Sequence, residues 1–215
     1  MREFPLCGGS VSAERIHDAA AYFSVLGQSA SALAWDRVDL ISQLLYGAYQ
    51  EDKTTYLFGN GGSASLASHF ACDLAKGTWI HGCDQRRFRA VALTDNLPIL
   101  TAWANDSSYE DVFSEQLRGL IQAGDIAFAI SCSGNSRNVL KALELARESG
   151  ALTVGLGGFE GGSMKRLCDV SLIVPSDNMQ IIEDLHLSVA HCLFTLLRNR
   201  IASEAPQKVV AARAS

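Results

Sequence analysis

Residues 54–76 have the sequence TTYLFGNGGSASLASHFACDLAK, and the fold prediction rests on the change from strand to helix within them. The apolar run 54–58 is typical of a buried strand, and it stops at the turn Gly59-Asn60-Gly61-Gly62-Ser63. Glycines allow a sharp turn and a close approach of the backbone to a ligand, and the helix that follows directs its free N–H groups at the same space. The stretch therefore predicts a strand–turn–helix unit that binds an anion, most often a phosphate.

A titratable pair lies on the predicted helix. His69 and Asp73 are four residues apart, so they share one helix face. Next to a phosphate site, such a pair indicates chemistry on a small phosphorylated molecule, although the same spacing also suits a surface pair worth roughly a few tenths of a kcal/mol. The glycines fit neither nucleotide fingerprint, because no Lys-Ser/Thr follows them and the G-x-G-x-x-G spacing is missing.

A second turn of the same design follows residues 126–130. That apolar run leads into Ser131-Cys132-Ser133-Gly134-Asn135-Ser136, and a helix pattern begins directly afterwards. Serine hydroxyls and backbone N–H groups in this place can donate to phosphate oxygens, although a serine that only caps the helix would give the same sequence. Two such turns without a lysine favour a sugar phosphate over a nucleotide.

The order of apolar runs predicts the fold class. Continuous apolar strands are typical of a parallel sheet that helices cover on both faces, and alternating strands and helices predict an α/β fold, a three-layer αβα sandwich with ligands at the carboxyl ends of the strands. We expect one domain over residues 1–203 and a disordered tail over 204–215. The expected strands are 54–58, 88–93, 126–130, 152–156 and 170–174, and the expected helices are 12–50 (one or two), 63–76, 97–104, 108–123, 136–149, 162–167 and 178–201.

Composition excludes several classes of protein. The chain has 215 residues, of which 48% are hydrophobic and 19% charged, as in a compact globular domain. A net charge of −5 and a single short basic run, 86–89, argue against nucleic-acid binding. No apolar stretch reaches membrane-spanning length, and residues 1–5 do not open a signal peptide. The six cysteines are scattered without a C-x-x-C pair, which indicates reduced thiols in a cytoplasmic protein.

The two turns, together with His69-Phe70-Ala71 and the segment Glu183–His191, resemble the sugar isomerase (SIS) domain and, within it, the phosphoheptose isomerase family. The resemblance covers nearly the whole chain. It implies a flavodoxin-like, five-stranded parallel sheet between helices, with N-terminal helices at 12–50, and a homotetramer whose active sites are shared between subunits. It also implies an aldose–ketose isomerase that interconverts sedoheptulose 7-phosphate and D-glycero-D-manno-heptose 7-phosphate through an enediol.

The resemblance assigns roles to individual positions. Asp73 is expected to be the catalytic base and His191 the catalytic acid. A divalent ion is expected at His69, Asp73, Glu183 and His191, and zinc suits these nitrogen and oxygen ligands best. Substrate contacts are expected at Asn60, Gly61, Gly62, Ser63, Asp73, Asn105, Asp106, Ser131, Cys132, Ser133, Ser136 and Glu183.

Three of these positions depart from the family pattern. Asp73 stands where a glutamate is expected, Glu183 where a glutamine is expected, and Cys132 where a threonine is expected. The carboxylate of Asp73 is one methylene shorter, about 1.5 Å, and a displacement of that size can cost about a hundredfold in rate. Glu183 adds a negative charge, which favours the binding of a dication.

Two alternatives concern the acid and the function. Helix geometry alone would pair Glu183 with His186, three residues further on. Glu183 and His191 lie about 80° apart around a helix of 3.6 residues per turn. The resemblance selects His191, and we expect His186 to be a buried or interface histidine. The Asp73 substitution also keeps open a non-catalytic SIS scaffold or regulator, whereas a sensor that controls transcription is disfavoured because the chain carries no DNA-binding module.

Overall fold

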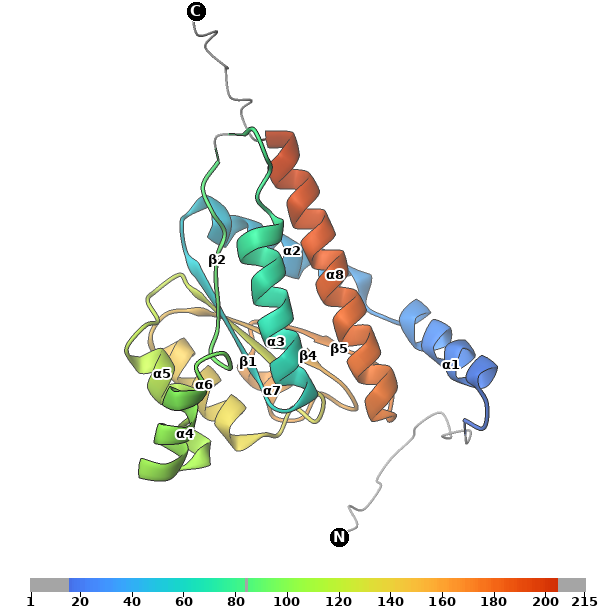
Figure 1. The fold of residues 1–215 in the computed structure, drawn as a ribbon. Helices are drawn as coiled ribbons and strands as arrows, with labels where there is room; N and C mark the ends of the chain where they lie inside the picture. The colour runs from blue at the N-terminus through green and yellow to red at the C-terminus, as the bar shows by residue number, and fades with distance from the viewer. Residues whose placement is uncertain (1–15, 84, 205–215) are drawn as a thin grey trace, which may run out of the picture.

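The computed structural model describes residues 16–83 and 85–204. Its centre is a five-stranded parallel sheet with the strand order β2-β1-β3-β4-β5 (Figure 1). This order and the helices on both faces confirm the predicted α/β sandwich. The strands are β1 (Thr54–Gly59), β2 (Arg89–Ala92), β3 (Ile126–Ser131), β4 (Leu152–Gly157) and β5 (Val170–Ile173).

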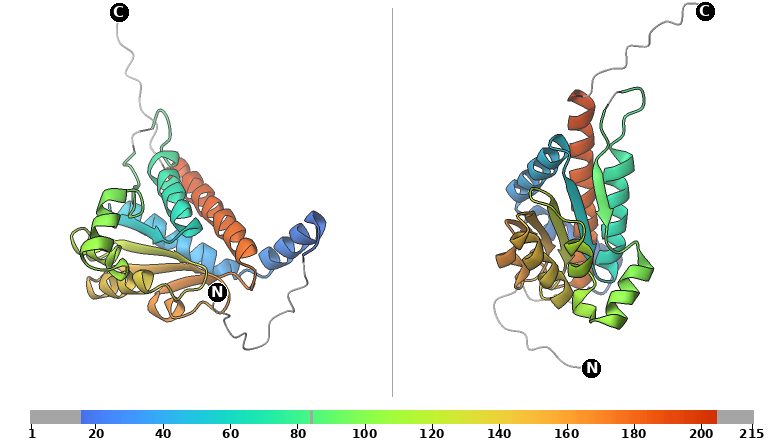
Figure 2. Two further views of the ribbon diagram at one scale, coloured as in Figure 1. Left: turned by 60° about the horizontal axis from the view of Figure 1, so that its bottom comes forward. Right: turned by 90° about the vertical axis from the view of Figure 1, so that its left-hand side faces the viewer.

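Helices form a layer on each face of the sheet (Figures 1 and 2). One face packs against α2 (Trp35–Gln50), α3 (Gly62–Cys72) and α8 (Met179–Glu204). The other face packs against α5 (Ser114–Arg118), α6 (Arg137–Glu148) and α7 (Met164–Leu167), with α4 (Leu97–Asp106) at its border. A further helix, α1 (Ala19–Ser31), contacts α8 and extends away from the sheet.

Burial on both faces explains why the strand sequences are continuously apolar. Every residue of β1 and β3 is buried, and successive side chains alternate between the two cores: Leu57 lies in one, and Tyr56 and Phe58 lie in the other. The edge strand β2 differs from the prediction that both faces are covered. Its Val91 is 43% exposed on the face that it shares with Tyr56, because α3 packs on the opposite face only.

Several predicted helices have different bounds in the structure. The stretch 108–123 is not one helix but a 3₁₀ turn, η2 (Tyr109–Asp111), followed by α5 and a loop. The predicted helix 63–76 changes after Cys72 into a π-helix, η1 (Asp73–Gly77). Within residues 16–83 and 85–204, no helix combines the length and the apolar character that crossing a bilayer requires.

Glu204, the first residue of the expected disordered tail, belongs to α8. Residues 203 and 204 belong to α8, where Glu204 accepts a hydrogen bond from Tyr46 and the guanidinium of Arg200 lies 3.7 Å from the centre of the Tyr46 ring. These contacts hold the end of α8 against α2. The remaining residues of the expected tail, 205–215, and residues 1–15 lie outside the described part of the chain.

Candidate active site

The two predicted turns lie side by side at the carboxyl edge of the sheet. The strands β1 and β3 are neighbours, and Gly59 is paired with Ile130. A Cβ at Gly59 would lie 2.5 Å from the carbonyl oxygen of Ile130 and 2.8 Å from the Cβ of Ser63, so only glycine lets the strand end and the start of α3 approach this closely. The loop 59–63 and the loop 131–136 therefore border one space.

Hydrogen bonds from the backbone of Ser163 and Met164 hold the loop 131–136 in place. Gly134 has a φ of +62°, and its carbonyl accepts a hydrogen bond from the N–H of Met164 at 2.9 Å. The side-chain oxygen of Asn135 accepts from the N–H of Ser163 at 3.0 Å. These contacts fix the backbone of the loop before any ligand arrives.

The serines of this loop differ in their availability. Ser131 is buried, whereas Ser133 is exposed and Ser136 is half-buried at the N-cap of α6. The side chain of Ser136 makes no capping hydrogen bond, which contradicts the alternative that this serine serves only to cap the helix. Its hydroxyl and the N–H groups of the first turn of α6 remain able to donate to an anion.

Cys132 is a buried, protonated thiol. It is 6% exposed. Burial raises the pKa of the Cys132 thiol, and the negative charge of Glu183 raises it further, while a hydrogen bond with Ser63 acts in the opposite direction. A thiol in this state packs as a small apolar group rather than acting as a nucleophile.

Three titratable side chains meet between α3, η1 and α8. The Nε2 atoms of His69 and His191 lie 2.9 Å apart, and Nε2 of His69 lies 3.3 Å from the carboxylate of Asp73. One ligand atom from each of the three residues lies within 4.8 Å of the other two. The side chain of His69 is 50% exposed and that of Asp73 is 24% exposed, so a small molecule can reach the group from solvent.

The π-helix places Asp73 at a local change of helix geometry. Asp73 is the first residue of η1, and the last, Gly77, accepts a hydrogen bond through its carbonyl from Nε of Arg198 on α8 at 3.2 Å. Short π-helical turns inside α-helices occur frequently at functional sites. Here the turn joins the end of α3 to α8, where Asp73 and His69 face His191.

Glu183 lines a hollow that it shares with His69. A hollow of about 330 Å³ runs between α3 and α8. A Cβ at Gly62 would lie 2.7 Å from the carboxylate of Glu183, so this carboxylate stands at the N-terminus of α3, where the helix dipole favours a negative charge. Glu183 does not join His69, Asp73 and His191 in the group of close ligand atoms. The hollow is lined by Gly62, Ser63, Ser65, Leu66, His69, Glu183, Asp184, His186 and Leu187.

Asn105 and Asp106 occupy the end of α4. Both side chains are exposed, and the amide of Asn105 donates to the carboxylate of Asp106 at 2.8 Å. Figure 1 shows α4 at the lower edge of the molecule, the edge at which α3 and α8 also begin. The helix that carries the pair is therefore on the side of the fold where α3 and α8 begin.

Two residues that the sequence analysis missed contact Asn60. The side chains of Asn60 and Asn138 exchange two hydrogen bonds of 2.9 Å, and the hydroxyl of Tyr109 donates to the side-chain oxygen of Asn60 at 2.9 Å. One signal was available, since asparagine is unfavourable inside a helix and yet Asn138 stands in the first turn of α6. No sequence signal pointed to Tyr109, because it lies in a stretch that was predicted to be helical.

His186 is a buried, neutral histidine, which confirms the expectation that it lies in the interior. It is 1% exposed, and its Nε2–H donates to the carbonyl oxygen of Gly157 at 2.9 Å. Its Nδ1 is buried without a hydrogen-bond partner among the described residues. Desolvation lowers the pKa of His186 to about 4, against a smaller opposing effect of the hydrogen bond to Gly157.

We expect His186 to make folding stability depend on pH. The pKa of His186 falls from 6.5 to about 4 on folding, so the unfolded chain binds the proton more readily and stability decreases as the pH falls from 6.5 to 4. The shift corresponds to about 3 kcal/mol. Urea unfolding at pH 7 and pH 4.5 should show a smaller loss for His186→Gln, which keeps the donor to Gly157, than for the wild type. An equal loss in both proteins, with the exposed His17→Gln as control, would contradict the assignment.

Comparison with known proteins identifies the class. Residues 16–158 match the SIS domain, so the chain is a SIS-domain protein. A phosphoheptose isomerase from Sulfurimonas denitrificans is 40% identical over 166 residues, which are 77% of this chain and 84% of that protein. A second, from Trichlorobacter lovleyi, is 36% identical over 188 residues, which are 87% of this chain and 92% of that protein.

A solved structure agrees with these relatives. The phosphoheptose isomerase from Neisseria gonorrhoeae superimposes with a TM-score of 0.76 at 31% identity, covering 84% of this chain and 96% of that one. The chain belongs to the phosphoheptose isomerase family.

Proposed function

We propose that the protein is a phosphoheptose isomerase that interconverts sedoheptulose 7-phosphate and D-glycero-D-manno-heptose 7-phosphate. The observation that carries the proposal is the group His69, Asp73 and His191, which is open to solvent and combines a carboxylate with two imidazoles. Membership of the phosphoheptose isomerase family supports this substrate pair. An aldose–ketose isomerisation requires a base beside a carbon-bound proton and an acid beside a carbonyl oxygen.

The loops bind the substrate in this mechanism. The hydroxyls of Ser133 and Ser136 and the N–H groups at the start of α6 hold the phosphate. Asn60 and the loop 61–63, with Asn105 and Asp106, hold the sugar hydroxyls. Ser131 and Cys132 contribute backbone groups to the loop, and Glu183 accepts a hydrogen bond from a hydroxyl in the hollow. Binding both ends of the sugar orients the reacting carbons toward Asp73.

Asp73 and His191 move the protons. Asp73 removes a proton from C1 of the ketose while His191 donates a proton to the carbonyl oxygen at C2, which gives the enediol. Asp73 then returns the proton to C2, and the deprotonated His191 accepts the proton of the C1 hydroxyl, which forms the aldehyde. Atoms and charge balance, because Asp73 and His191 each end in the protonation state in which they began.

The donor set fits a divalent ion. Two imidazole nitrogens and a carboxylate oxygen suit zinc, and one such atom from each of the three residues lies within 4.8 Å of the other two. We propose that His69, Asp73 and His191 hold the ion, with Glu183 as the fourth ligand if its side chain turns from Gly62. Such an ion supplies Lewis-acid polarisation of the carbonyl oxygen.

Zinc should stabilise the folded protein. At a hundredfold excess over its dissociation constant, added zinc should raise the melting temperature of chelator-treated protein by about 5–10 °C. His191→Ala should abolish this rise, whereas the exposed His17→Ala should retain it. Differential scanning calorimetry and elemental analysis of the purified protein provide the measurements. A wild-type protein that contains no divalent metal and shows no rise would refute the metal site.

The proposed reaction has a direct test. Purified protein is incubated with sedoheptulose 7-phosphate in D₂O, and NMR follows both the aldose product and the exchange of the carbon-bound proton. Ketose phosphates of five and six carbons serve as specificity controls. Binding without turnover or exchange on any of these sugars would refute the isomerase and support the alternative of a non-catalytic sugar-phosphate scaffold or regulator.

We also propose a homotetramer with shared active sites. An apolar groove of about 390 Å³ lies between α1 and α8. On α1, Phe23 is 68% exposed, and Trp35 at the start of α2 is 49% exposed, which is typical of a surface that another subunit covers. Light scattering on a size-exclusion column measures the assembly state.

A cytoplasmic location is consistent with the cysteines. The five cysteines in the described part of the chain are all free. Free thiols persist in a reducing compartment, so we place the protein in the cytoplasm.

A further inference from the structure

A chain of hydrogen bonds determines which way the side-chain amide of Asn60 faces. The pair Asn60–Asn138 would satisfy its two hydrogen bonds equally well if both amides were reversed. The backbone N–H of Val139 removes this ambiguity, because it donates to the side-chain oxygen of Asn138 at 2.9 Å. Asn138 must then receive the amide N–H of Asn60 at the same oxygen and offer its own N–H to the oxygen of Asn60.

The oxygen of Asn60 is fully occupied as a result. It accepts from Asn138 and from the hydroxyl of Tyr109, each at 2.9 Å, which uses both lone pairs. One proton of the Asn60 amide goes to Asn138, and the second has no acceptor among the described residues. Asn60 is half-buried at the turn between β1 and α3, so this remaining proton is the one polar contact that its side chain can still offer a ligand.

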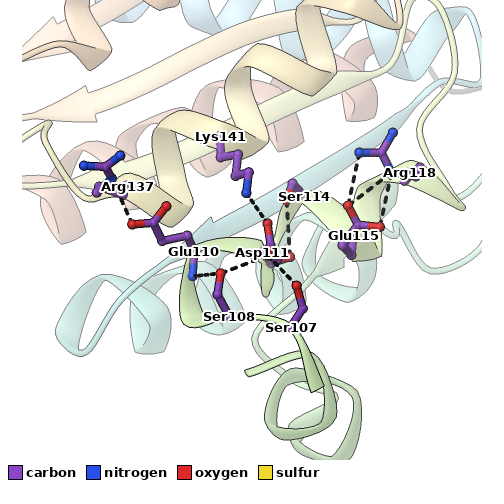
Figure 3. Close-up of polar contacts among 9 residues, drawn as sticks. All are labelled: Ser107, Ser108, Glu110, Asp111, Ser114, Glu115, Arg118, Arg137 and Lys141. Atoms are coloured by element: carbon purple, nitrogen blue, oxygen red, sulfur yellow. Dashed lines mark hydrogen bonds and ion pairs between the residues drawn. The ribbon is translucent and has the colours of Figure 1, made fainter. Parts of the chain in front are cut away.

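The residues next to Tyr109 in the chain hold it in place. Its neighbours Glu110 and Asp111 form ion pairs with Arg137 and Lys141 on α6, the helix that also carries Asn138 (Figure 3). Asp111 additionally accepts hydrogen bonds from the hydroxyls of Ser107 and Ser108. The hydrogen bond from Lys141, followed by those from the two serines, lowers the pKa of Asp111 to about 2, so this anchor stays charged at neutral pH.

The tyrosine ring itself is not part of the core. Tyr109 is 57% exposed, although its hydroxyl is bonded to a half-buried amide at the site. Asn138, by contrast, is only 3% exposed. An exposed ring that is followed in the chain by two ion-paired residues and is bonded through its hydroxyl contributes orientation rather than packing.

We propose that Tyr109 and Asn138 are positioning residues that hold Asn60 as a one-directional hydrogen-bond donor to an acceptor oxygen of the phosphorylated sugar. The inference rests on the proposed function for its ligand. Because the orientation is set before the ligand binds, it lowers the ordering cost of binding. The site therefore selects a carbonyl, ring, hydroxyl or phosphate oxygen with a free lone pair at this point, and rejects a group that can only donate.

A double-mutant cycle tests whether Tyr109 acts through Asn60. Tyr109→Phe should raise KM for sedoheptulose 7-phosphate by about 3- to 10-fold, the value of one hydrogen bond, with a smaller change in kcat. In an Asn60→Ala background the same substitution should have no effect, because the group that it orients is gone. The matched control is Tyr56→Phe, which removes a hydroxyl bonded to the carbonyl of Leu120 at 3.1 Å, away from the turn.

Two results would overturn the inference. One is an equal rise of KM when Tyr109→Phe is made in wild type and in Asn60→Ala. The other is an NMR measurement on the free protein in which both side-chain amide protons of Asn60 exchange equally fast with solvent, since the bonded proton should be protected and the other not.

The NMR measurement needs no turnover, and this separates the two proposals. If the protein binds sedoheptulose 7-phosphate without converting it, the isomerase fails. The positioning role is then decided by the same cycle on dissociation constants from calorimetry. If the protein binds none of the sugar phosphates, Asn60 has no ligand to donate to, and both proposals fail.

Discussion

Replacing Asp73 by asparagine is expected to lower kcat by about 10²- to 10⁴-fold, the range that a positioned general base contributes. The substitution keeps the size of the side chain and removes its basicity. KM should change far less, because the phosphate contacts lie on the loop 131–136. Steady-state kinetics with sedoheptulose 7-phosphate provide both constants, and proton exchange in D₂O reports the first step alone.

A matched control separates loss of the base from loss of charge. Asp36→Asn removes a carboxylate whose side chain is 81% exposed on α2, and it should leave kcat unchanged. Undiminished proton exchange in Asp73→Asn would show that another group is the base. Asp73→Glu adds the methylene that the family pattern expects: activity should fall if the site has adapted to the shorter acid.

The strands could be predicted closely because a strand that is buried on both faces has apolar residues at consecutive positions. All five strands are within one residue of the predicted bounds at each end, and β2, the partly exposed edge strand, is one residue shorter at both ends. Helix 108–123 could not be predicted correctly. The 3₁₀ turn that interrupts it contains Asp111, which bonds to Lys141 from 30 positions away in the chain.

The candidate site shows the same division between local and distant information. The pair His69 and Asp73 follows from a spacing of four residues, but His191 joins it from 122 positions away. Spacing on α8 favoured His186 as the partner of Glu183, yet His186 is buried and donates a hydrogen bond to the carbonyl oxygen of Gly157. Only the packing of α3 against α8 decides which histidine meets His69 and Asp73, and no periodicity in either segment contains that information.

Alanine at Gly134 is expected to destabilise the protein by about 3 kcal/mol or more, because two penalties add. The φ of +62° costs a non-glycine residue about 1–2 kcal/mol. In addition, a Cβ at Gly134 would clash with the carbonyl oxygen of Gly161, a backbone atom that accepts a hydrogen bond from the N–H of Lys165, so the loop 131–136 must shift. The substitution should therefore also raise KM for the phosphorylated sugar, whereas a purely conformational penalty would not.

Gly82→Ala isolates the first penalty from the second. Gly82 has a φ of +82°, but a Cβ there would have no atom within 4 Å. Urea unfolding should give a loss of about 1–2 kcal/mol for Gly82→Ala, clearly smaller than for Gly134→Ala. Equal losses would mean that the close contact between a Cβ at Gly134 and the backbone of Gly161 is relieved without cost. In that case the loop is not braced before ligand binding, and the phosphate would have to order it.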